Sequence, residues 1–293
     1  MKKIISHLWF DKQVKEAAEF YVSAFPEAAI DDITELKGTP SGDVTTISLT
    51  LLDHEFMLIG AGPEFKFNPS ISFVVACANA AEFDALWQPL SVGGKVLMEP
   101  AEYSFSPRYG WLEDKYGLSW QLTVTEKAGQ AKIVPDLMFS GPQHGKAEEA
   151  LNFYLSVFSE SEMGGIARYG NKEEPEQEGT IKQASFSLFG QLFSVRDSAL
   201  DHGFGFNESI SFLVRCNSQE EIDYYWEKLS AVPESEQCGW LKDKFGVSWQ
   251  IAPAIMDELM RQKDQEKVDR VTQAFLKMKK LDILTLEKAA EGR

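Results

Sequence analysis

Several residue types that mark particular protein classes are scarce in this chain of 293 residues. It has only three cysteines, at spacings that fit neither a metal site nor a disulfide framework. The apolar run at the N-terminus is broken at His7 and Asp11, too early for a signal peptide. Since no apolar run approaches the roughly 18 residues of a membrane span, we expect a protein of the reducing cytoplasm.

Basic residues are also few. Lysine and arginine number 29 against 45 acidic residues, which gives a net charge of −16. Nucleic acids and anionic membrane surfaces both require clustered positive charge, so neither is an expected partner. The acidity is typical of a soluble protein.

The chain repeats itself. GWLEDKYGLSWQLTV, residues 110–124, returns as GWLKDKFGVSWQIAP at 239–253, with nine of the fifteen positions identical. A spacing near 130 residues is too long for a solenoid repeat and indicates a duplicated domain. We therefore expect a first domain over residues 1–127, a short polar linker around Gly129, a second domain over 131–253 and a helical tail over 254–293.

Hydrophobic periodicity predicts the same elements in both halves. Strand-like alternation over residues 4–10 is followed by helical spacing over 14–25 and by three more strands, and a second such cycle begins near residue 70. Each half thus has two βαβββ modules, an α+β fold, and the halves are expected to form an intrachain pseudo-dimer, with a homodimer left open. Alternation places Trp120 and Trp249 in the core and Gln121 on the concave face, whereas His54 is expected in a surface turn.

Several motifs resemble the vicinal oxygen chelate superfamily, which contains glyoxalase I, bleomycin-resistance proteins and extradiol dioxygenases. They are His7 in the first strand, Phe20-Tyr21 thirteen residues later, and the D-x-x-G turn before the last strand. The strings FNPSISF, GWLEDKYGLSWQ and KMKKLDILTLEKA resemble its PhnB-like branch, often labelled demethylubiquinone methyltransferase-like. The resemblance implies two tandem glyoxalase-like domains. A methyltransferase activity gains no support, because no G-x-G-x-x-G loop follows a strand.

The superfamily holds its metal with residues from the first and last strands of paired modules. Carried over to this chain, those positions are His7 and Gln121 in the first half, and Asp136 and Gln250 in the second. One imidazole and one amide are too few ligands for a catalytic divalent ion. The resemblance therefore implies a degenerate metal site with no expected cofactor, and a divalent metal held weakly by His7 and Gln121 is the alternative.

The two halves differ most before the repeated GWL. The first half carries a longer segment there, whose aromatic and basic residues suit a small-molecule pocket. The alternative is a longer edge strand and turn that packs against the other half. The predicted ligand site comprises His7, Trp9, Tyr103, Phe105, Arg108 and Gln121. The favoured function is small-molecule binding with an unknown ligand. A metal-dependent glyoxalase-type lyase or isomerase and a purely structural protein are the alternatives, and the sequence decides neither catalysis nor whether the halves exchange modules.

Overall fold

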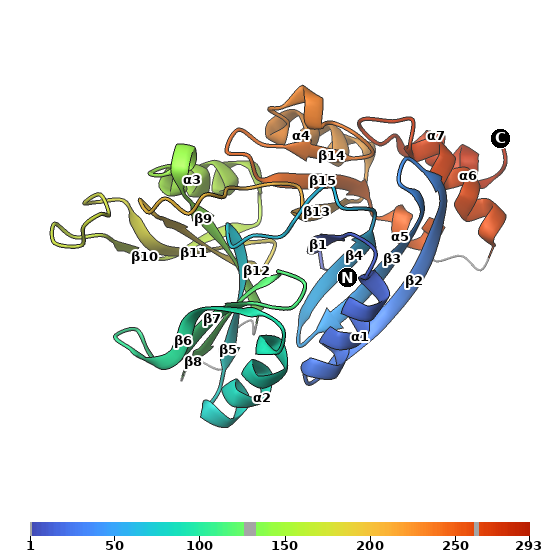
Figure 1. The fold of residues 1–293 in the computed structure, drawn as a ribbon. Helices are drawn as coiled ribbons and strands as arrows, with labels where there is room; N and C mark the ends of the chain where they lie inside the picture. The colour runs from blue at the N-terminus through green and yellow to red at the C-terminus, as the bar shows by residue number, and fades with distance from the viewer. Residues whose placement is uncertain (1, 126–132, 261–263) are drawn as a thin grey trace.

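Two mixed β-sheets form the framework of the protein (Figure 1). The computed structural model describes residues 2–125, 133–260 and 264–293, so the linker predicted around Gly129 lies outside the described residues. Within the described part, no helix is both long and apolar enough to cross a bilayer.

The seven-stranded sheet combines strands from both halves of the chain. Its order is β14(Trp240–Lys242), β15(Ser248–Pro253), β13(Ile210–Cys216), β1(Ile4–Phe10), β4(His54–Gly60), β3(Gly42–Leu51) and β2(Ala28–Thr39). Its outer, convex face is packed by α1(Val14–Ala24) and α4(Gln219–Leu229).

The eight-stranded sheet is its counterpart. Its order is β10(Ser161–Arg168), β11(Ile181–Leu188), β12(Gln191–Asp197), β9(Ile133–Phe139), β5(Ile71–Cys77), β8(Ser119–Val124), β7(Ser106–Glu113) and β6(Lys95–Tyr103). Helices α2(Ala80–Ser91) and α3(Ala147–Val157) pack on it. Short 3₁₀ turns span Gly141–Gln143 and Pro233–Ser235, and the tail forms α5(Ile255–Met260), α6(Gln265–Phe275) and α7(Ile283–Ala290).

The two halves exchange modules. Strand β1 of the first half pairs antiparallel with β13 of the second, with His7 opposite Ser211. Equivalently, β5 pairs with β9, with Ser72 opposite Asp136. Neither half builds a sheet alone, so each sheet contains one module from the first half and one from the second, which answers the question of module exchange that the sequence left open.

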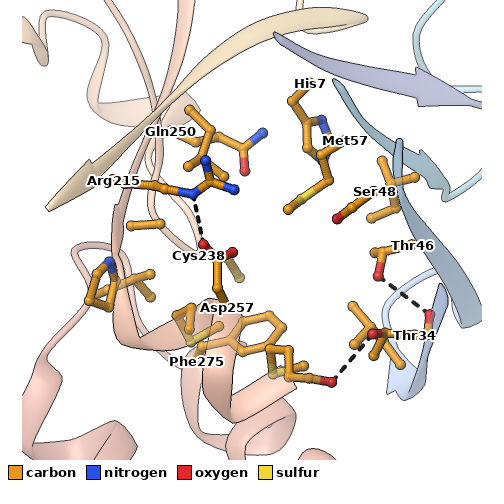
Figure 2. Close-up of a pocket in the computed structure, with 18 of the residues that line it drawn as sticks. His7, Thr34, Thr46, Ser48, Met57, Arg215, Cys238, Gln250, Asp257 and Phe275 are labelled. Atoms are coloured by element: carbon orange, nitrogen blue, oxygen red, sulfur yellow. Dashed lines mark hydrogen bonds and ion pairs between the residues drawn. The ribbon is translucent and has the colours of Figure 1, made fainter. Parts of the chain in front are cut away.

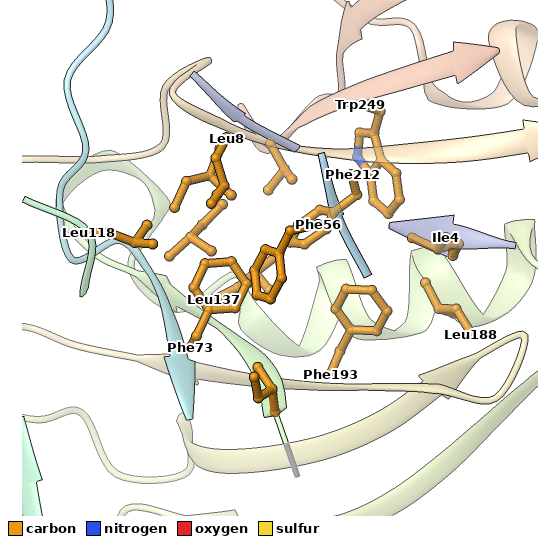
Figure 3. Packing of buried hydrophobic residues seen from close by; sticks show 14 of the residues in the cluster. Ile4, Leu8, Phe56, Phe73, Leu118, Leu137, Leu188, Phe193, Phe212 and Trp249 are labelled. Carbon is orange, nitrogen blue, oxygen red and sulfur yellow. The ribbon is translucent and has the colours of Figure 1, made fainter. Parts of the chain in front are cut away.

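The faces of the two sheets that are turned away from their concave sides pack against each other and form the main core (Figure 3). Phe56 of one sheet contacts Phe73 of the other with ring centroids 5.1 Å apart, and Phe193 and Phe212 repeat this contact at 5.1 Å. Because alternate strand residues point to opposite faces, these aromatic rings leave the concave faces to other side chains.

Reciprocal hydrogen bonds mark the approximate two-fold relation between the halves. Asn68 donates from Nδ2 to the Gly205 carbonyl at 3.1 Å, and Asn207 donates to the Lys66 carbonyl at 2.9 Å. Both asparagines belong to the repeated FNxSISF string. The prediction that His54 lies in a surface turn is wrong. Its imidazole is buried, and its Nδ1 lies 3.4 Å from Nε2 of Gln191 in the other half.

The repeated D-K-[YF]-G turn holds a buried carboxylate in each half. Asp114 accepts hydrogen bonds from Tyr21 of α1 at 2.8 Å and from the Trp120 indole at 2.9 Å. Asp243 accepts the equivalent bonds from Tyr154 and Trp249, at 2.7 and 2.9 Å. Trp120 and Trp249 are core residues as predicted.

These turns also bind the two sheets together. Each Asp accepts two further backbone N–H bonds, and burial raises the pKa of both carboxyls. Since α1 packs on the seven-stranded sheet while Asp114 lies in the turn between β7 and β8 of the eight-stranded one, the Tyr–Asp–Trp contact crosses between them. The repeated sequence therefore specifies the joint between the sheets.

The last module departs from the predicted βαβββ pattern. It has only three strands, because the segment after α4 is too short to add the outer strand that β6 supplies in the other sheet. The tail takes that place, since Cys238 and Gly239 donate backbone hydrogen bonds to the carbonyls of Met278 and Lys279 at 2.8 and 2.7 Å.

Removing one Tyr hydroxyl from the joint tests its importance. Tyr21→Phe and Tyr154→Phe should each lower the free energy of unfolding by about 2 kcal/mol, because a buried carboxylate loses a donor. The control is Tyr116→Phe, whose hydroxyl donates to the exposed Glu16 and should change stability by less than about 0.5 kcal/mol. Equal effects of all three substitutions in urea unfolding would contradict the assigned role.

Candidate functional site

The concave face of the seven-stranded sheet is covered by the C-terminal tail. Helices α5 and α6 lie across it (Figure 1), and together with the sheet they enclose a cavity of about 170 Å³. Gln273 of α6 donates to the Lys37 carbonyl on edge strand β2 at 3.2 Å. On the opposite edge the tail is bonded to Cys238 and Gly239, so it bridges both margins of the curved sheet.

Polar groups from five strands and from helix α5 line this cavity (Figure 2). His7 comes from β1, Gln250 from β15 and Ser48 from β3, and all three point inward because strand side chains alternate. The rest of the wall is mainly apolar and includes Met57, Ile59, Leu213, Met256, Met260 and Phe275.

His7 is the most constrained of these groups. It is 3% exposed, its ring meets Trp240 edge-on at 5.2 Å, and its Nδ1 has no hydrogen-bond partner among the described residues. Burial lowers its pKa to about 3, so the imidazole is neutral near neutral pH. A neutral imidazole offers a ligand one donor and one acceptor.

Gln250 lies on the sheet side of the cavity, as His7 does, and has spare hydrogen-bonding capacity. Its Nε2 donates to Ser211 at 3.0 Å. Since an amide carries two N–H bonds and an acceptor oxygen, further capacity remains for a ligand. Figure 2 shows Gln250 and His7 on the same side of the cavity, above Met57 and opposite the tail.

Arg215 brings a charge to the cavity wall, but that charge is neutralised. Its Nη1 lies 2.7 Å from Glu55 and also donates to the Lys2 carbonyl at 2.8 Å. Its Nε lies 2.7 Å from Asp257 of α5 in an ion pair whose alignment falls short of a hydrogen bond. The guanidinium therefore fastens the tail to the sheet and is not free to bind an anionic ligand.

A second, larger hollow of about 350 Å³ adjoins the cavity; we call it the outer groove. Trp240, Phe275 and Cys238 line both spaces and form the wall between them, together with Leu36 and Ile59. Trp9 and Phe65 line only the outer groove. The two spaces are thus neighbouring compartments on one face of the sheet.

The concave face of the eight-stranded sheet has a different chemistry. Asp136, at the position equivalent to His7, accepts a 2.7 Å hydrogen bond from the Nε of Arg196 on β12. Ser194 and Gln121 also donate to this carboxylate. Gln121 accepts in turn from Tyr109 at 2.7 Å. The centre of this sheet is therefore occupied by an internal ion pair with its hydrogen bonds satisfied.

Neither concave face fits the divalent metal that the superfamily uses. In the seven-stranded sheet, the equivalent donors are an imidazole, a thioether, a hydroxyl and an amide, and no carboxylate joins them. In the eight-stranded sheet, a guanidinium already holds the carboxylate. Throughout residues 2–125, 133–260 and 264–293, no group of three His, Cys, Asp or Glu side chains is placed to hold a metal ion.

The six residues of the predicted ligand site lie in two different sheets. His7 lines the cavity and Trp9 the outer groove of the seven-stranded sheet. Gln121 belongs to β8 of the eight-stranded sheet, so the residue that shares a concave face with His7 is Gln250. The physical reason is module exchange, which pairs β1 of the first half with strands of the second half.

The other three predicted residues belong to the β6–β7 hairpin. Tyr103 and Phe105 stack on each other at 5.6 Å, and Phe105 is 66% exposed. Arg108 pairs with Asp84 of α2 and lies over the Phe83 ring at 5.0 Å, so it faces the helix. Of the alternative given for this segment, the longer edge strand is present as β6, whereas the contacts of Arg108 lie on α2 of the same half.

Two arginines were not identified from the sequence. Arg215 is the only charged residue of β13, and Arg196 stands beside Asp197 in β12, at positions where the first half has Ala76 and Ile59. A charge in a strand that is otherwise buried was the available signal, because such a charge must be paired.

Comparison with known proteins places the fold and the family. The chain matches the family model described as 3-demethylubiquinone-9 3-methyltransferase twice, over residues 2–123 and 131–252. A PhnB protein from Bacillus cereus is 36% identical over 42% of this chain and 100% of its own, with a TM-score of 0.40. No match was found among curated proteins.

Another solved structure is similar to this protein over most of the chain. Glyoxalase I from Zea mays is 11% identical, with 87% of this chain and 95% of that chain covered and a TM-score of 0.57. At that identity the likeness shows the fold alone, which is the vicinal oxygen chelate fold expected from the sequence. The two matches of the family model cover most of the chain, and the protein therefore belongs to the PhnB-like family described as 3-demethylubiquinone-9 3-methyltransferase.

Proposed function

We propose that the protein binds a small, neutral, partly apolar molecule in the cavity between the seven-stranded sheet and the tail. The observation that supports this proposal most strongly is the cavity itself, which is about 170 Å³ in volume. Apolar side chains line it opposite His7, Gln250 and Ser48. An apolar cavity of about 150 Å³ accommodates benzene, so this one suits a ligand, or the head of a ligand, of about ten heavy atoms.

The charges of the lining favour a neutral ligand. Arg215 is balanced by Glu55 and Asp257, so a carboxylate or phosphate would find no free cation. His7 is held neutral by burial. Asp32 also lines the cavity, and its carboxylate accepts the Thr34 hydroxyl at 2.8 Å, so the remaining charge of the lining is negative and disfavours an anion. The neutral donors and acceptors beside it suit a carbonyl, amide or hydroxyl group on the ligand.

Binding without a metal is part of this proposal. Lewis-acid catalysis of the glyoxalase type needs a divalent ion held by several anionic or imidazole ligands. Met57 and Gln250 stand among the equivalent positions, and neither is such a ligand for a hard or borderline cation. Because Cys77, Cys216 and Cys238 are unpaired, we also propose a reducing, cytoplasmic location.

Matched neutral and anionic probes test the ligand class. Benzamide and benzoate have nearly the same shape, and benzamide should raise the melting temperature saturably whereas benzoate should not. Gln250→Leu should abolish the benzamide shift, because the cavity loses its amide. The matched control is Gln121→Leu at the equivalent position of the other sheet, which should keep the shift while lowering stability. A shift with benzoate alone, or no shift with either probe, would refute the proposal.

The pH dependence of stability tests whether His7 is neutral. Its folded pKa of about 3 lies below the ordinary 6.5, so the unfolded chain binds a proton first as the pH falls. The stabilising contribution is complete above pH 6.5 and is lost as the pH falls from 6.5 towards 3. His54 behaves alike, with a pKa of about 3.

A variant isolates the His7 contribution. Between about pH 7 and about pH 5, the native protein should lose about 2 kcal/mol more unfolding free energy than His7→Gln, because a titrating group contributes about 1.4 kcal/mol per pH unit. His54 remains in both proteins and cancels in the difference. Parallel pH profiles in chemical denaturation would show that His7 titrates alike in the folded and unfolded states, which would contradict its lowered pKa.

A further inference from the structure

The outer groove has a lining that differs from that of the cavity beside it. It is about twice as large, at about 350 Å³ against about 170 Å³. Four aromatic rings line it: Trp9 from β1, Phe65 from the loop after β4, Trp240 from β14 and Phe275 from α6. Elements from both halves and from the tail thus converge on one half-open hollow.

Three of these rings form an ordered aromatic wall. Trp9 meets Phe65 edge-to-face at 5.1 Å and Trp240 at 6.0 Å. The Trp9 indole donates a 2.8 Å hydrogen bond to the Gly62 carbonyl, which fixes the ring. None of the three is fully buried. Electron-rich faces of Trp rings attract organic cations, more strongly when part of the hydration is removed.

The charged residues of the groove have one sign. Its lining within the described chain includes Glu208 and Glu234 and no Lys, Arg or His. Glu208 pairs with Lys242 at 2.7 Å, whereas Glu234 is exposed at the rim. The net charge of −16 adds a favourable field for any cation that approaches.

We propose that the outer groove binds an organic cation, a planar or alkyl ammonium whose charge lies against Trp9 and Trp240 and near Glu234. The aromatic wall supplies the contact area and the carboxylate at the rim supplies selectivity for charge. This subsite goes beyond the neutral-ligand cavity and does not require it. Trp9, Phe65 and Glu234 line the outer groove and do not line the cavity.

Two dyes with the same ring system, which differ by one N-methyl group and its positive charge, test the charge preference. The probe is 10-methylacridinium, which carries a permanent positive charge, compared with acridine, which is neutral in mildly alkaline buffer. The cation should bind one site per chain, about tenfold more tightly than acridine, and quench tryptophan fluorescence. Equal or tighter binding of acridine, or no binding of the cation, would overturn the proposal.

Variants separate this subsite from the cavity. Trp9→Leu and Glu234→Lys should each weaken 10-methylacridinium several-fold, whereas Glu162→Lys, the same charge change on exposed β10, should not. Ser48→Met, which fills the cavity, should abolish the benzamide shift but leave the dye affinity unchanged. Loss of dye affinity in Glu162→Lys as large as in Glu234→Lys would reduce the effect to net charge and refute the subsite.

Discussion

The antiparallel pairing of β1 with β13 and of β5 with β9 is the constraint on which the rest depends. These ladders join a module of one half to a module of the other, so neither sheet closes without both halves. The Tyr–Asp–Trp joint and the reciprocal Asn68 and Asn207 bonds then fix the two sheets against each other. Exchange also decides which polar residues meet, because it places His7 with Gln250 and Asp136 with Gln121.

The same framework carries two different interiors. In the eight-stranded sheet the centre of the concave face is occupied by the ion pair of Arg196 with the hydrogen-bonded Asp136. In the seven-stranded sheet the concave face is covered by the tail, which the Arg215–Asp257 ion pair fastens to the sheet. A cavity with neutral donors and acceptors lies beneath it. One interior thus holds an internal ion pair and the other holds a cavity, which is why our functional proposals concern only the seven-stranded sheet.

The fold could be predicted because local sequence patterns determine its strands and helices. Alternation and helical spacing placed the strands and helices, and the repeated GWL…SWQ string revealed the duplication and the buried Trp120 and Trp249. The site could not be predicted to the same extent. Which strands lie side by side is a non-local property, so the sequence could not choose between Gln121 and Gln250 as the neighbour of His7. Nor could periodicity reveal that the tail would cover a concave face, or that the lone Arg215 would hold it there.

Module exchange is tested most directly by cutting the folded chain between its halves. A protease recognition sequence introduced at residues 126–132, a polar stretch of the sequence between β8 and β9, would allow the first half to be cut from the second. Our account predicts that the cut protein elutes as one complex with both fragments in equal amounts, and that they part only in denaturant, since strands of both fragments share each sheet. Separation in buffer into two folded, monomeric halves would contradict it.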